Sequence, residues 1–189
     1  MLGIDEAHGI LVDKLTYDPG KFYGSANGLN LGVGQIFAGI RFPIYSEEKG
    51  IFQTANGIVY VVTHECDIDQ NNKRPFNTHL LICPILDFRI FVEEYQKTFS
   101  ESVLKSLISR IALRDVSRVV YLPYYNENDM PYGGLLYLNQ ITNTSIDVFS
   151  GRGVQQVCTV TSYGLGIIDQ SICNHLLRPK VEALPLMNY

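Results

Sequence analysis

The chain has 189 residues, of which 46% are hydrophobic and 18% charged, and its formal net charge is −4. This length is enough for one domain with a substantial core, and the composition excludes a disordered protein. The acidic balance also excludes a global positive field for nucleic acid, so RNA binding would need a local basic patch. The first residues lack a secretory signal, and no apolar run approaches the roughly 18 residues that span a bilayer. We therefore expect a cytoplasmic protein with no membrane partner.

A glycine-rich segment lies near the start of the chain. Residues 20–34, GKFYGSANGLNLGVG, predict a loop with a short strand at Gly20–Tyr23. The segment contains neither GxGxxG nor GxxxxGK[ST], so the glycines do not predict a phosphate-binding loop.

Three apolar segments separated by polar turns predict strands after residue 34. Their sequences are GQIFAGIRFPIY, GIVYVVTH and HLLICPIL. The continuous apolar runs Ile58–Val62 and Leu80–Ile82 indicate strands covered on both faces, as in the interior layer of a small barrel. We therefore expect a barrel core over about residues 30–90.

A helix is predicted over residues 100–114, SESVLKSLISRIALR, which has a Ser/Glu start and apolar residues at helical spacing. We expect its apolar face to pack on the barrel. The preceding FRIFVEEYQK fits a strand passing into a helix, and its periodicity does not decide between the two.

A strand and helix extension is predicted for residues 117–189. RVVYLPYY reads as a strand, NENDMPYGG as a loop, and LLYLNQITNTSIDVF as a pair of strands around a turn. Asp169 is the predicted N-cap of a terminal helix, QSICNHLLR, that stops before Pro179. The whole chain, 1–189, is thus predicted to be a single β-rich α+β domain.

The segment Val61–Gln70, VVTHECDIDQ, carries the densest group of reactive side chains. On a strand, His64 and Cys66 share one face, and Glu65 and Asp67 point the other way. By the same rule His79 and Cys83 share a face of the next strand, so a hairpin would bring two histidines and two cysteines together, a ligand set that zinc accepts. His79 and Cys83 are roughly 13 Å apart along a strand, so one ion needs a bulge to reach both. The alternative is that the cysteines are small buried thiols. Without a secretion signal, all four cysteines read as thiols rather than disulfides.

Two other kinds of chemistry fit the same segment. Cys66 is a candidate nucleophile with His64 or His79 as base and Asp67 or Asp69 orienting it, although neighbouring carboxylates oppose a lowered thiol pKa. Asp67 and Asp69 also fit a divalent-ion site or an acid and base pair. The alternative is that Asp67 caps the turn at DQNN.

Tyrosines and basic residues form two further groups. The tyrosines gather around the loop at 126–134, where they suit either a binding surface or packing of the sheet. They are Tyr121, Tyr124, Tyr125, Tyr132 and Tyr137. The basic residues form a local patch if the DQNNKRP turn meets the end of the main helix; otherwise they are a solvated helix end. They are Lys73, Arg74, Arg110, Arg114 and Arg118.

The runs GQIF, IVYVVTHECDID and RPFNTHLLICPI resemble the opening strands of the SH3-like barrels of the MazF/PemK toxin class. THECDI, LLICPI, YLP and LLYLNQI, in this order, are similar to uncharacterised bacterial and phage proteins with a Ser/Thr-x-x-Cys-Asp-Ile/Leu strand end. The resemblance implies an SH3-like barrel core in a prokaryotic or phage setting, such as defence or toxin–antitoxin systems. Toxin ribonucleases of this class use an arginine beside a hydroxyl residue, which implies Arg41 and Thr63 as the corresponding pair.

The leading prediction is a non-enzymatic binding module that engages a partner protein or a small ligand, without a cofactor. Its predicted ligand-binding residues are His64, Cys66, Asp67, Asp69, Tyr124, Tyr125 and Tyr132. The first alternative is a MazF/PemK-like endoribonuclease acting on RNA, with Arg41, Thr63, Cys66 and Asp67 as catalytic candidates. The second is a structural zinc protein that uses His64, Cys66 and His79. Each alternative is compatible with a homo-oligomer.

Overall fold

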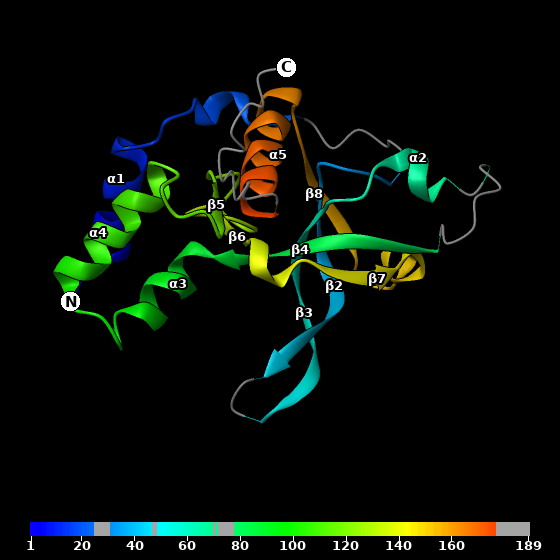
Figure 1. The fold of residues 1–189 in the computed structure, drawn as a ribbon, viewed down its shortest axis with the longest axis horizontal. Coiled ribbons are helices and arrows are strands. Elements are labelled where there is room, and N and C mark those ends of the chain that lie inside the picture. Colours follow the sequence, from blue (N-terminus) through cyan, green and yellow to red (C-terminus); the bar gives the residue numbers. More distant parts are fainter. Residues whose placement is uncertain (25–30, 47–48, 70, 72–77, 177–189) are drawn as a thin grey trace, which may run out of the picture.

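The computed structural model describes residues 1–24, 31–46, 49–69, 71 and 78–176 (Figure 1). In this part of the chain an eight-stranded, mostly antiparallel sheet combines with five α-helices, which confirms the predicted β-rich α+β class. The helices are α1 (Ile4–Asp13), α2 (Glu65–Ile68), α3 (Phe88–Tyr95), α4 (Glu101–Ala112) and α5 (Ser162–Leu176). The strands are β1 (Tyr23–Gly24), β2 (Gln35–Ser46), β3 (Ile51–Val61), β4 (His79–Asp87), β5 (Val119–Leu122), β6 (Gly134–Tyr137), β7 (Thr142–Ser145) and β8 (Gln155–Val160). Three 3₁₀ turns complete the fold: η1 (Pro19–Lys21), η2 (Leu138–Gln140) and η3 (Ile146–Ser150).

The sheet is open. Its strand order is β1-β8-β2-β3-β4-β6-β5, and β7 pairs with the first half of β4 while β6 pairs with the second. Strands β3 and β4 lie between β2 and β7 in the pairing order. The sheet nevertheless curls enough to bring β7 to β2, where the Thr144 hydroxyl donates to the Arg41 carbonyl at 3.5 Å. Among the described residues, however, no ladder joins the ends of the sheet, so the expected closed SH3-like barrel is not confirmed.

The helix predicted over 100–114 is confirmed as α4, but its partner differs from the prediction. Its buried residues Leu104, Ile108 and Ile111 belong to a hydrophobic cluster with α1, α3, β5 and β6. These helices gather at one end of the molecule, away from α2 (Figure 1). The apolar face of α4 therefore packs on a helical layer and the β5–β6 pair, and not on strands β2 and β3.

Side-chain contacts explain where two of the helices begin. The ambiguous segment after Asp87 is a helix from its first residue, because the Asp87 carboxylate accepts from the backbone N–H groups of Arg89 and Ile90. The terminal helix begins at Ser162, not after Asp169, because Thr161 caps it by accepting from Gly164 N–H at 3.3 Å. Gly164 permits the close approach of α5 to the end of β8, because a Cβ at this position would lie 2.5 Å from Val160 Cγ1.

Three other elements depart from the expected pattern. The N-terminal helix α1 and strand β8 were not predicted, and the predicted strand at 20–23 is the turn η1 followed by the two-residue β1. In η1, the Asp18 side chain accepts from Gly20 N–H, which closes a turn where a strand was expected. The other predicted strands are found, with β3 starting earlier, at Ile51. No helix of the described residues is long and apolar enough to cross a membrane.

Candidate functional site

The polar segment after β3 is a single helical turn and not a strand. Ladder pairing of β3 ends at Val61, and the Thr63 hydroxyl then accepts the Leu81 N–H at 2.7 Å in place of a backbone carbonyl. The chain turns into α2, with His64 at its N-cap. Ile68 is the buried residue of this turn, whereas His64, Cys66 and their acidic neighbours are exposed. The prediction that His64 and Cys66 share one face of a strand is therefore wrong.

A pocket of about 450 Å³ lies beside this turn. Segments far apart in the sequence form it: the loop before β2, the start of α2, the end of β8 and the first turns of α5. Its lining residues are Gly32, Val33, Gln35, His64, Glu65, Thr159, Val160 and Leu165. We call it the α2 pocket.

Two glycines and a buried amide fix the wall of the α2 pocket. A Cβ on Gly32 would lie 2.7 Å from Glu65 Cβ, so only glycine lets the loop touch α2. Gly34 has φ +86° and joins two strands, accepting from Val160 N–H at 2.8 Å and donating to the Val61 carbonyl at 3.1 Å. Gln35 is 1% exposed, and its Oε1 accepts from Gly32 N–H at 3.1 Å. The loop is thereby held against both β3 and β8.

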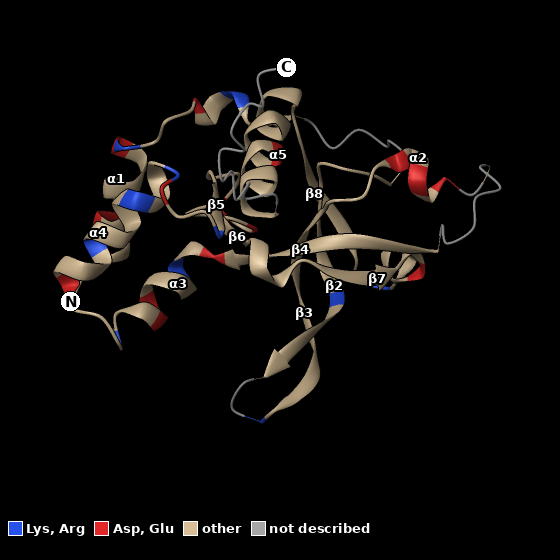
Figure 2. Ribbon diagram, in the orientation of Figure 1, with Lys and Arg blue, Asp and Glu red and all other residues tan. Residues whose placement is uncertain are grey.

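The mouth of the α2 pocket is acidic. Glu65 Oε2 lies 3.7 Å from His64 Nδ1, and both side chains are more than half exposed. Asp67 and Asp69 follow within four residues, and Figure 2 shows the acidic group on α2. Asp69 caps the next turn: its Oδ1 accepts from the N–H and Nδ2 of Asn71 at 2.9 and 3.0 Å.

The four predicted zinc ligands have different surroundings. Cys83 is buried, donates to the Tyr137 carbonyl at 3.6 Å, and burial raises its pKa to about 12. Cys66 is exposed, and its thiol lies 3.8 Å from Asp67 Oδ1. His79 is exposed and pairs with the Thr78 hydroxyl. Within the described ranges, no three His, Cys, Asp or Glu side chains are grouped as a metal site, and the cysteines are free thiols, as expected.

The residues suggested as a ribonuclease pair are separated. Arg41 lies opposite Asn56 in the β2–β3 ladder, and Thr63 follows Asn56 by seven residues, roughly 20 Å of strand. The Thr63 hydroxyl is also engaged with Leu81. Of the suggested basic patch, Lys73 and Arg74 lie outside the described residues, and Arg114 donates to Gln170 Oε1 at 2.7 Å.

The tyrosines divide between packing and surface. Tyr121 is 2% exposed and donates to the Tyr132 carbonyl, and Tyr125 packs edge-on against Tyr23. Tyr132 donates to Asp5 at 2.8 Å. Tyr124, 50% exposed, is the most exposed of the five, and Tyr125, Tyr132 and Tyr137 are partly exposed.

Tyr124 lines a second, largely apolar pocket of about 390 Å³ with His8, a residue that the sequence did not single out. His8 Nε2 lies 3.2 Å from the Tyr121 hydroxyl. That hydroxyl donates to Tyr132, so its oxygen accepts from Nε2–H and leaves His8 Nδ1 as an acceptor. His8 was missed because α1 itself was not predicted.

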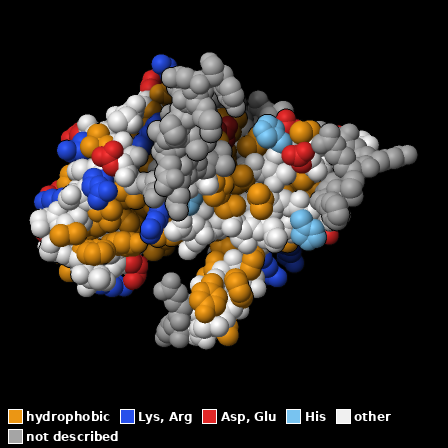
Figure 3. All heavy atoms as spheres, in the orientation of Figure 1, with side chains coloured by type: hydrophobic (Ala, Val, Ile, Leu, Met, Phe, Trp, Pro, Cys, Tyr) orange, Lys and Arg blue, Asp and Glu red, His pale blue; other side chains and the backbone are white. Residues whose placement is uncertain are grey.

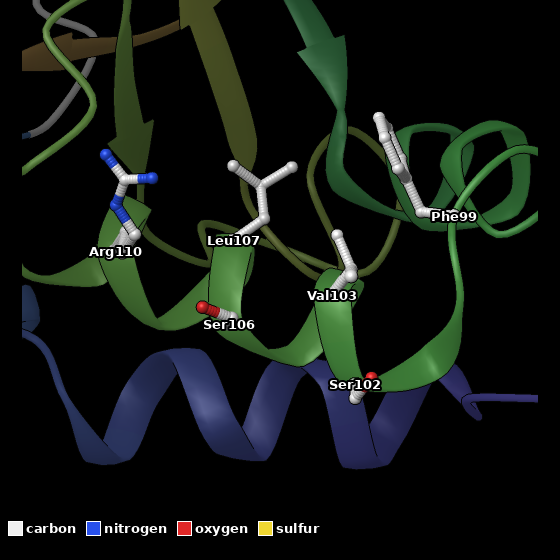
Figure 4. A pocket seen from close by; sticks show the side chains of 6 residues that line it. All are labelled: Phe99, Ser102, Val103, Ser106, Leu107 and Arg110. Carbon is white, nitrogen blue, oxygen red and sulfur yellow. The ribbon is translucent and has the colours of Figure 1, made fainter.

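A third pocket, of about 350 Å³, follows the outer face of α4 (Figure 4). Its lining residues are Phe99, Ser102, Val103, Ser106, Leu107 and Arg110. Among these described lining residues, Arg110 is the single ionisable group.

Comparisons of the chain with protein-family models, curated proteins and solved structures find no match. The resemblance to the MazF/PemK class therefore stays a prediction, and the site has to be argued from its own geometry.

We expect His8 to titrate below the ordinary histidine pKa of 6.5, because burial lowers its pKa more than Asp5 raises it. The unfolded chain then takes up this proton at a higher pH than the folded one, so the free energy of unfolding should fall as the pH drops below 6.5. NMR titration of the imidazole Cε1–H signals, with His8→Gln to assign one of them, measures the midpoint. A midpoint at or above 6.5 would contradict the prediction.

Proposed function

We propose that the protein is a non-enzymatic binding module that takes a long cationic side chain of a partner protein in the α2 pocket. The observation that supports this proposal is the composition of the pocket, whose lining is largely apolar and includes the carboxylate of Glu65. An arginine or lysine has matching chemistry, since its methylene stem covers apolar surface while its charged head bonds a carboxylate.

The lining residues supply both halves of this contact. Val33, Val160 and Leu165 offer surface for the stem, and Glu65 accepts from the head group. Glu65 has no cationic neighbour within salt-bridge distance among the described residues other than the His64 imidazole. Asp69 adds negative charge near the mouth, which favours the approach of a basic segment.

Titration with Nα-acetyl-arginine amide, followed by NMR, tests the proposal. We expect backbone signals of Glu65 and Leu165 to shift with millimolar affinity, and the uncharged isostere Nα-acetyl-citrulline amide to bind more weakly. Glu65→Gln should weaken arginine binding by about threefold, the size typical of an exposed ion pair.

Asp13→Asn is the matched control, because it removes the same charge from an exposed position of α1. An equal response to arginine and citrulline, or an equal effect of both variants, would overturn the proposal.

RNA cleavage that is lost with Arg41→Ala or Asp67→Ala would instead support the ribonuclease prediction. Stoichiometric zinc that is lost on changing His64 or Cys66 would support the zinc prediction.

The SH3-like core is also part of this proposal. The Thr144–Arg41 hydrogen bond, which brings β7 to β2, supports a relation between the curled sheet and such a barrel. A barrel of this kind would place the loop before β2 and the α2 turn at one rim.

A further inference from the structure

Strands β2 and β3 extend well beyond the rest of the sheet as a two-stranded arm (Figure 1). Beyond the pairs with β8 at Gln35–Ala38 and with β4 at Val59–Val61, the two strands pair only with each other among the described residues. We call residues 41–46 and 51–57 the β-arm. Two-stranded ribbons are marginal on their own in water, so this segment gains stability when a further strand covers it.

The β-arm exposes large apolar side chains. Phe52, Tyr45 and Ile51 are 75%, 56% and 54% exposed. Tyr45 and Phe52 face each other across the ladder with ring centroids 5.4 Å apart. Figure 3 shows hydrophobic side chains along the projecting hairpin. Grouped apolar surface of this kind marks an interaction site more often than isolated exposed residues do.

The outer edge of β3 lacks the features that usually prevent strand pairing. Natural edge strands carry lysine, proline or a bulge. The sequence from Ile51 to Gly57, IFQTANG, has no charged residue and no proline, and its ladder with β2 is regular. The neighbouring strand β2 is protected, because Pro43 has no N–H and Arg41 is charged. One edge of the β-arm is therefore open to another strand and the other is not.

We propose that the open edge of β3 pairs with β3 of a second copy of the chain, antiparallel across a two-fold axis. The two β-arms then form a four-stranded sheet. A two-fold axis places the same surface on both sides of the interface, so the segment has to be compatible with itself. The uncharged strand Ile51–Gly57 meets this requirement, because no like charges face each other when it pairs with its own copy.

The distribution of charge favours a second copy over a charged partner. The chain carries a net charge of −4, and two copies repel each other wherever acidic groups meet. Figure 2 shows acidic residues on the helices and none on the described part of the β-arm. The β-arm is thus a surface where two acidic molecules meet with little repulsion, whereas the absence of acidic groups from its described part gives a basic partner no anchor.

Sedimentation velocity and light scattering of the purified chain test the proposal. The expected mass is 42.6 kDa, twice the 21.3 kDa of one chain. Thr54 lies exposed at the centre of the open edge, and Thr54→Lys places like charges close together in the dimer. We expect this variant to be a 21.3 kDa monomer with an unchanged circular dichroism spectrum.

Ile90→Lys is the matched control, because Ile90 is 49% exposed on α3, away from the β-arm. This variant should remain dimeric. Hydrogen exchange should be slower at alternate amides of residues 51–57 in the wild type than in Thr54→Lys. A wild-type monomer at concentrations up to about 100 μM, above the dissociation constants of stable interfaces, would overturn the proposal. So would a dimer that Thr54→Lys leaves intact.

Discussion

Replacing Gly133 with alanine is expected to lower the free energy of unfolding by about 3 kcal/mol or more. Gly133 has φ +74°, a conformation that L-residues rarely adopt. A Cβ there would also lie 2.2 Å from the Leu122 carbonyl oxygen and 2.6 Å from the Tyr121 hydroxyl. The carbonyl belongs to the backbone of β5, so the clash cannot be relieved by rotating a side chain.

The displacement would reach the hydrogen bonds around Tyr121. Its hydroxyl donates to the Tyr132 carbonyl, next to Gly133, and accepts from His8. The Gly133 carbonyl also accepts from Phe88 N–H, at the start of α3. One added methyl group thus perturbs the junction of β5, β6, α1 and α3.

Gly153→Ala is the control that separates backbone strain from crowding. Gly153 has φ +87°, but a Cβ there meets no atom within 4 Å. Its substitution should cost about 1 kcal/mol from strain alone. Thermal unfolding should therefore show Tm lower by about 6–12 °C for Gly133→Ala and about 2–4 °C for Gly153→Ala. Equal shifts would mean that crowding at Gly133 contributes nothing.

The parts of the fold that the sequence predicts are those with a local signal. The end of β3 and strand β4 contain continuous apolar runs, and α4 has a strong helical period. Helix α1 buries only Ala7 and Leu11 among its ten residues, so its pattern is weak. The start of α5 contains Gly164, which disfavours a helix locally and is required there by contact with Val160 and Phe22.

The candidate site was predicted in part, for a similar reason. His64 was identified from its position after an apolar strand, and it does line the α2 pocket. Glu65 was placed on the opposite face, because strand alternation was assumed where the chain forms a helical turn. Gly32, Thr159 and Leu165 come from distant segments, so their meeting with Glu65 depends on the tertiary fold and has no local signal.

Phe88→Ala should lower the free energy of unfolding by about 3–5 kcal/mol, the range for removing a large core aromatic. Phe88 is fully buried at the start of α3. Its ring lies 6.0 Å from the ring of Phe91 and 5.9 Å from that of Tyr121, measured between centroids. Because Phe88 lies between the helical layer and β5, the cavity left by alanine would loosen both. Urea denaturation of the purified variant measures the loss.

The same substitution at Phe52 is the matched control. Phe52 is 75% exposed on the β-arm, and its ring contact with Tyr45 is a cross-strand pair worth about 1 kcal/mol or less. Phe52→Ala should therefore shift the urea midpoint by less than a third as much as Phe88→Ala. If Phe52→Ala were as destabilising as Phe88→Ala, the β-arm would be part of the folding core, and its exposed aromatics would need a structural role rather than a role in association.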